Sequence, residues 1–253
     1  MTEASKMKQT TLALAAAAAL LTNASAFAGE FAVGIAAYKM DSPYQGFDDE
    51  DGVVPLLSYE GEDFSFSDGD LGYRIYGEKE RPLNVYLVLT SAGSGFDSSY
   101  SAVFAGMAER DDSIDFGLSA DLDAGPGVLS ATLVHDISGS HKGYSVDIGY
   151  SLALELSDRF TFEPAAGVQY LSSDFTDYYF GVRSNEVTAS RAAYTADSSV
   201  HPYVGYQMQY ELTENWMLLH DVGYAWLDKE VQNSPLVDKE VIWAASLGAI
   251  YRF

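Results

Sequence analysis

The last stretch of the chain, Trp243 to Phe253, reads WAASLGAIYRF and raises the question of fold class. Every second residue counted back from Phe253 is apolar or aromatic, whereas the alternate positions are smaller and more polar and include Ser246, Gly248 and Arg252. A period of two places the two sets on opposite faces of a β-strand. Because a soluble β-sandwich and a membrane barrel both contain such strands, the rest of the chain must choose between them.

The same alternation returns in long runs elsewhere, for example at residues 144–156, 159–171 and 199–212. Strands of soluble sandwiches usually contain about 5 or 6 residues, whereas a tilted strand that crosses a bilayer needs about 9 to 11. One face of each run is rich in Leu, Val, Ile, Phe and Tyr, and the other in Gly, Ala, Ser, Asp and Glu. These lengths and faces favour strands with hydrocarbon outside and a polar interior.

We therefore predict an all-β fold, a closed antiparallel transmembrane β-barrel of about 12 strands, with ten as the alternative. Closure is expected because an open sheet edge would leave backbone groups unpaired in lipid. The expected strands span residues 30–39, 53–60, 63–67, 70–77, 82–91, 112–123, 128–138, 143–156, 159–171, 199–212, 214–228 and 239–253.

The connections between these strands are of two kinds. Short turns, such as residues 157–159 and 213–215, alternate with long polar connections. Outer-membrane barrels show this asymmetry, with short turns on the periplasmic side and long loops outside. The long connections are residues 40–52, 92–112, 172–200 and 229–239.

The N-terminus carries the pattern of a secretory signal peptide. Lys6 and Lys8 precede an apolar core at residues 11–21, and small residues follow up to Ala28. The core is too short for a membrane-spanning helix, which needs about 20 residues. We expect residues 1–28 to be a cleaved signal peptide, with cleavage after Ala26 as the alternative, and residues 29–253 to form the barrel domain.

The composition excludes several kinds of function. Lys and Arg total 14 against 37 Asp and Glu, a formal net charge of -23, which argues against nucleic acid as a partner. The absence of cysteine excludes disulfides, thiolate nucleophiles and Cys-based metal sites. We expect no cofactor. The acidic run at residues 48–51 is interpreted as a solvated loop, with divalent-cation binding as the alternative.

Several motifs are similar to those of the MipA/OmpV family of outer-membrane proteins. They occur in order across residues 31–253. The matching residues are Tyr44, Gly46, Gly106, Met107, Arg110, His135, Asp136, Ser138, Gly139, His141, Gly143, Tyr179, Gly181, Glu186, Ser234 and Pro235. The terminal Tyr251 and Phe253 resemble the signal that the barrel assembly machinery reads.

This resemblance implies a location in the cell outer membrane, among its lipid and lipopolysaccharide, and no catalytic activity. It also implies a scaffold for cell-wall enzymes, a murein hydrolase and a murein synthase. We expect such a structural or interaction protein, whose periplasmic rim or outer loops dock its partners.

Two other functions stay open. The first is a narrow channel for small cationic or neutral solutes, because several acidic residues share the inward parity. These residues are Asp115, Asp121, Asp147, Glu155, Glu163 and Glu211. The second is a lipid-acting enzyme, since His135, Asp136 and Ser138 contain the residue types of a hydrolytic triad. Neighbours on one strand point to opposite faces, so we instead interpret the segment as a short outer hairpin.

The charged residues of the motifs suggest ion pairs, since a charge that faces a low dielectric needs a partner. Arg110 is paired with Glu109 in this prediction, and Arg183 with Glu186. Arg252 is expected to meet an Asp or Glu inside the barrel.

Overall fold

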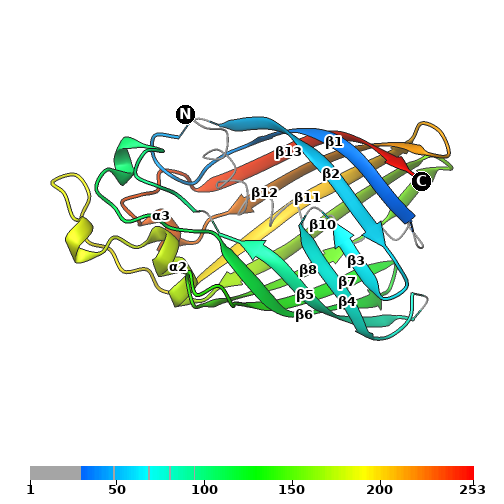
Figure 1. The fold of residues 1–253 in the computed structure, drawn as a ribbon, viewed down its shortest axis with the longest axis horizontal. Coiled ribbons are helices and arrows are strands. Elements are labelled where there is room, and N and C mark those ends of the chain that lie inside the picture. Colours follow the sequence, from blue (N-terminus) through cyan, green and yellow to red (C-terminus); the bar gives the residue numbers. More distant parts are fainter. Residues whose placement is uncertain (1–29, 48, 68, 80, 94) are drawn as a thin grey trace.

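The strands of this protein close into a single antiparallel barrel (Figure 1). A computed structural model describes residues 30–47, 49–67, 69–79, 81–93 and 95–253. The expected signal peptide, residues 1–28, lies outside the described residues. Thirteen strands form one sheet, and because β8 and β9 lie end to end along β10, they occupy twelve positions around the barrel.

The strands agree with the prediction of twelve positions, and the alternative of ten is wrong. Their bounds lie within three residues of the expected ones, apart from the split of the 143–156 strand. They are β1 (Glu30–Met40), β2 (Glu50–Glu60), β3 (Phe64–Ser67), β4 (Asp70–Tyr76), β5 (Leu83–Ala92), β6 (Ser113–Ala124), β7 (Gly127–Asp136), β8 (Tyr144–Ser151), β9 (Leu154–Ser157), β10 (Phe160–Leu171), β11 (Ser199–Glu211), β12 (Trp216–Trp226) and β13 (Val241–Arg252).

The first and last strands close the ring. β1 pairs with β13 on one side and with β2 on the other, with Ala32 opposite Arg252 at one end and Met40 opposite Ala244 at the other. Along β13 the side chain of Leu247 is 58% exposed on the outside, whereas Ile250 is buried inside. The alternation of the C-terminal stretch therefore separates a lipid-facing side from a lumen-facing side, as predicted.

The expected strand at 143–156 is interrupted at Leu152 and Ala153, where β8 ends and β9 begins. The interruption lies opposite Pro164 of β10, whose carbonyl oxygen accepts a hydrogen bond from the backbone N–H of Leu152 at 3.1 Å. Because proline has no N–H to donate to the ladder, regular pairing stops there. Irregular segments of this kind change the direction of a strand.

The two ends of the barrel differ. At one end, here called the turn end, short turns join the strands and the C-terminus lies (Figure 1). At the opposite end, here called the loop end, the long connections carry two α-helices and two 3-10 helices. They are η3 (Ala102–Phe104), α2 (Ser173–Phe180), η4 (Ser184–Glu186) and α3 (Lys229–Gln232). No helix among the described residues is long and apolar enough to cross a membrane.

Candidate functional site

The long connections meet over the barrel mouth in a buried aromatic cluster. The ring of Tyr44, which follows β1, lies 5.4 Å from Phe96 and 5.1 Å from Phe104 after β5, and 5.6 Å from Phe180 of α2, measured between centroids. β1, β5 and β10 lie at well-separated positions around the barrel. Side chains from all three can meet only above the lumen, so this cluster covers the mouth.

We call this covering the cap. Its members are almost completely withdrawn from solvent, and their burial makes the cap a small hydrophobic core of its own. They are Tyr44, Phe96, Phe104, Met107, Leu171, Phe175, Tyr179, Phe180, Val182, Tyr203, Ala225, Leu227, Val231, Leu236, Val237 and Ile242.

A buried ion pair joins two loops of the cap. Nη2 of Arg110 lies 2.9 Å from Oε2 of Glu186, and both side chains are 1% exposed. Burial by itself raises the pKa of the Glu186 carboxyl, but donors from Arg110 and from the N–H groups of Arg183 and Ala108 outweigh it and hold this pKa below its usual value. The remaining Arg110 donors bond the carbonyl oxygens of Tyr178 and Ala108.

The predicted pairs of Arg110 with Glu109 and of Arg183 with Glu186 are therefore wrong. Glu109 and the Arg183 side chain are exposed, and Arg183 contributes only its backbone N–H. A buried carboxylate is stabilised most by a donor that is buried with it. Arg110 and Glu186 lie far apart in the chain, and no local pattern predicts that they come together.

A second buried arginine, Arg191, was not singled out from the sequence. Its guanidinium group donates to the carbonyl oxygens of Glu186, Val103 and Ala105. It thus ties η4 to the loop that carries η3. Arg191 stands alone between small residues, so no local pattern could have identified it.

The segment from His135 to Gly143 forms the short outer hairpin that was expected. The carboxylate of Asp136 accepts hydrogen bonds from the N–H groups of Ser138, Gly139 and Lys142 at 2.7–2.9 Å and from the Ser138 hydroxyl at 2.7 Å. His135 points outward and contacts the carbonyl oxygen of Asp136 through Nδ1. These residues shape a turn. Their side chains do not form the hydrogen-bonded series of nucleophile, base and orienting acid that a hydrolytic triad requires.

His141, near the end of this hairpin, has a completely buried side chain. Its Nδ1 accepts the Gly143 N–H at 3.0 Å, which assigns the ring proton to Nε2. Nε2 lies 3.0 Å from the Ser113 hydroxyl and 3.4 Å from Oδ1 of Asp115. The ring also packs against Phe175, 4.4 Å between centroids.

The glycine positions of the motifs have steric reasons. A Cβ on Gly143 would lie 2.4 Å from the Ser172 hydroxyl and 2.7 Å from the Phe175 nitrogen. Gly46, Gly106 and Gly139 have positive φ angles of 73°, 79° and 84°, which favour glycine.

The predicted motif residues gather in the cap and the hairpin beside it. The Tyr44 hydroxyl donates to the carbonyl oxygen of Tyr179 at 3.3 Å, and the Tyr179 hydroxyl to that of Asp111 at 2.9 Å. Burial raises the pKa of both phenols. The Ser234 hydroxyl bonds the carbonyl oxygen of Phe180 at 2.6 Å. Tyr251 and Phe253 instead lie at the turn end, where Phe253 packs against Phe31.

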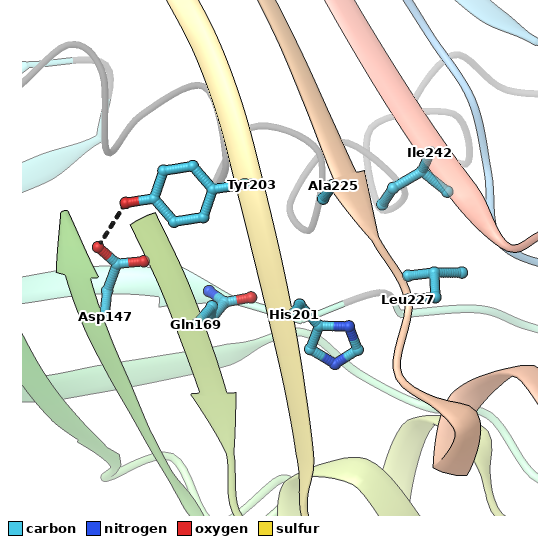
Figure 2. Close-up of a pocket in the computed structure, with 7 residues that line it drawn as sticks. All are labelled: Asp147, Gln169, His201, Tyr203, Ala225, Leu227 and Ile242. Carbon is cyan, nitrogen blue, oxygen red and sulfur yellow. Dashed lines mark hydrogen bonds between the residues drawn. The ribbon is translucent and has the colours of Figure 1, made fainter. Parts of the chain in front are cut away.

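Below the cap, polar side chains from neighbouring strands face the lumen. The Tyr203 hydroxyl donates to Asp147 at 2.9 Å beside His201 and Gln169 (Figure 2). The cavity between them has a volume of about 10 Å³, which admits about one water molecule.

The inward parity of the acidic residues agrees with the prediction along most of the lumen. Asp115 and Glu163 are buried, and Glu211 meets Arg252 at 2.9 Å, which confirms the expected partner of that arginine. Asp221 accepts from Gln207 at 2.9 Å and from Ser246. Within the described ranges, no group of three or more His, Asp or Glu is arranged to hold a metal ion.

Comparison with known proteins gives consistent results. A family model described as MltA-interacting protein MipA matches residues 33–253. The outer membrane protein OmpV of Vibrio cholerae is 31% identical over 225 residues, which cover 89% of this chain and 87% of that protein.

Two further proteins are similar to this chain. The MltA-interacting protein of Escherichia coli is 26% identical over 226 residues, covering 89% and 91% of the two chains. Among solved structures, the translocator domain of autotransporter NalP from Neisseria meningitidis aligns with a TM-score of 0.46 and 12% identity, over 95% and 93% of the chains.

Proposed function

This chain belongs to the family of the MltA-interacting protein MipA, located in the outer membrane, and from that premise we propose that it is a non-enzymatic scaffold that docks cell-wall (murein) enzymes. Of its relatives, one is named for the protein that it binds, MltA. The barrel would then act through its surfaces and not through a reaction or a pore.

The cap is the observation that carries this proposal. Phe96, Phe104, Phe180, Val231 and Leu236, from loops on different sides of the mouth, are all 0% exposed. A core packed this closely leaves little room for solute.

The turn end is the surface we assign to docking, since murein enzymes act in the periplasm. Its turns are short and therefore held firmly by the strands. Their exposed carboxylates would steer a basic partner surface toward this end. These acidic residues are Glu62, Asp63, Asp123, Asp158 and Glu214.

Crosslinking in intact envelopes, followed by identification of the attached proteins, tests the docking. We expect MltA or another murein enzyme to be recovered from the wild type. The double variant Asp158→Lys with Glu214→Lys should lose most of the recovery. The matched control is Asp238→Lys at the loop end, also an exposed carboxylate, which should retain it. Equal recovery from both variants would contradict docking at the turn end.

Single-channel recordings on the purified barrel test the competing function. The acid-lined lumen favours a narrow channel for small cations or neutral solutes, and a steady, salt-dependent conductance would support that channel against the scaffold. We expect no such conductance, because the cap covers the mouth. A lipid-acting enzyme would instead show turnover that disappears in His135→Ala.

A further inference from the structure

Among the described residues, the barrel wall is shorter beside β2 than elsewhere. β3 contains 4 residues and β4 contains 7, whereas the flanking β2 and β5 contain 11 and 10. The register pairs Ser58 of β2 with Ser67, the residue of β3 that lies nearest the loop end. Figure 1 shows this hairpin reaching only part of the way along β2 from the turn end.

The loop-end half of β2 is therefore a strand edge. Residues Asp51–Leu56 pair with β1 on one side, and on the other side the described part of the chain supplies no strand to them. Alternate residues of a strand direct their N–H and C=O groups to each side. About half of the backbone groups in this segment thus point along the wall into the space above the hairpin.

Such an edge is costly at membrane depth. Backbone groups without a partner in hydrocarbon are strongly destabilising, and open edges persist only where protein or trapped water covers them. A lipid chain cannot hydrogen-bond these groups. Whatever covers the edge must supply donors and acceptors at the spacing of a strand.

The side chains of the edge show which kind of cover fits. Residues 53–57 read VVPLL and are apolar on both faces. Val53 is 64% exposed on the outer face, and Val54 and Leu56 lie half-buried on the inner face. Leu56 packs against the buried cluster of Ala32, Met217 and Ile250 inside the barrel, so the inner face of this segment is dry, which disfavours a water-filled opening.

Pro55 is a second sign of an edge. Proline cannot donate to a ladder and within sheets is confined to edge strands, first positions and bulges. Here it lies in the middle of β2, opposite Ile35 in a regular register. The exposed carboxylate of Asp51 marks the loop-end limit of the segment.

We propose that the β2 edge, Asp51–Leu56, is a docking site for an extended segment of another protein, which adds to the barrel wall as one more strand. The segment has about six residues, is apolar on both faces, and places a Lys or Arg opposite Asp51. This interaction is additional to the proposed docking of murein enzymes and lies nearer the opposite end of the barrel.

A second copy of this chain does not fit the edge. Two copies in one membrane share the same orientation, so a two-fold axis along the membrane normal presents their β2 strands in parallel. Under the same axis, the outer face of one β2 strand lies on the same side as the inner face of the other. Residues at the same height then point in opposite directions, so the two strands cannot form a regular parallel ladder. The partner strand must therefore come from a different sequence.

A synthetic peptide tests the site on the purified full-length barrel in bilayers. The probe is an eight-residue peptide of alternating Val and Leu with one Lys at an end. The control peptide has the same side chains but N-methyl groups on alternate backbone nitrogens, which removes the donors of one edge. Hydrogen exchange is followed at the amides of residues 51–54 and 56 and, as an internal reference, at Val204 of β11, which is paired on both sides.

We expect the probe to slow the fast-exchanging amides of the edge about tenfold or more and to leave Val204 unchanged, while the N-methylated peptide has no effect. A variant with the β3–β4 hairpin lengthened by four residues on each strand should lose the response, because its own chain then covers the edge. This variant retains every strand of the wild type.

Three outcomes would overturn the proposal. Equal protection by both peptides would indicate apolar adsorption in place of strand addition. Slow exchange in vesicles of lipopolysaccharide and phospholipid without peptide would show that the membrane already covers the edge. Fast exchange that no peptide alters would indicate a water-filled side opening. None of these outcomes bears on murein-enzyme docking, which the envelope crosslinking tests separately.

Discussion

The two ends of this barrel are held together by different physics. At the loop end, the cap is a second hydrophobic core with a completely buried ion pair, Arg110–Glu186. At the turn end, short turns join the strands, and the ion pair there, Arg252–Glu211, has a glutamate side chain that is 42% exposed. The loop end therefore has tertiary structure of its own, which can open while the wall stays intact.

The largest expected effect breaks the buried pair. Arg110→Met leaves the Glu186 carboxylate buried without its cation, so the free energy of local cap opening should fall by about 3–5 kcal/mol. Hydrogen exchange of amides in residues 173–186 measures it. The matched control is Arg252→Met at the turn end, where solvent screens the charge. There the free energy of local opening should fall by about 1 kcal/mol or less. Equal losses at both ends would contradict the comparison.

A leucine pair compares the cap core with the lipid-facing wall. Leu236→Ala empties a site that is 0% exposed and should lower the free energy of cap opening by about 2–4 kcal/mol. Leu247→Ala, on the outer face of β13, leaves no cavity because lipid fills the space, and cap opening should not change. Hydrogen exchange of the cap amides measures the free energy of cap opening in both variants. A cap unaffected by Leu236→Ala would show that its packing contributes little.

A smaller effect is expected in the hairpin beside the cap. Asp136→Asn keeps one acceptor oxygen but removes the charge that holds three backbone N–H groups and a hydroxyl, at a cost of about 1–3 kcal/mol. Faster exchange at the Lys142 amide and faster proteolysis within residues 137–143 would report it. Asp123→Asn at the turn end is the control, and its effect on this hairpin should be nil.

The smallest effect is a pH dependence confined to the cap. The pKa of Glu186 is lowered in the folded cap, so its contribution is complete above the unfolded value of 4.5 and is lost as pH falls through the folded value. The free energy of cap opening, obtained from exchange rates corrected for the intrinsic pH dependence of amide exchange, should therefore be steady from about pH 8 to 5.5 and fall below about pH 4.5. Glu186→Gln should remove this component of the acid response. An onset near neutral pH would point to a group other than Glu186.

The strands could be predicted because each long one carries its own signal. The dyad pattern, the length and the lipid-facing apolar side of residues 241–252 are local properties, and the structure has them as expected. The break between β8 and β9 was missed, because its cause, Pro164, lies on the neighbouring strand. The motif residues could be chosen by resemblance, but their common place in the cap could not.

The partners of charged residues were harder to predict than the strands. Arg252 was expected to meet an inward carboxylate, and it does, because parity limits the choice to residues on the same face. For Arg110 and Glu186 no parity applies, since both lie in loops. Their pairing depends on how two loops cross the mouth, and Arg191 becomes visible only in that crossing.

The sequence by itself determined that this chain is an outer-membrane barrel of twelve strand positions, because period, strand length and the two contrasting faces are written along the chain within a dozen residues at a time. That the mouth is covered, and that the described strands leave the loop-end half of β2 without a second neighbour, follows only from the folded arrangement. Both depend on which segments meet across the ring, and the energy of such contacts is set by neighbours that lie far apart in sequence.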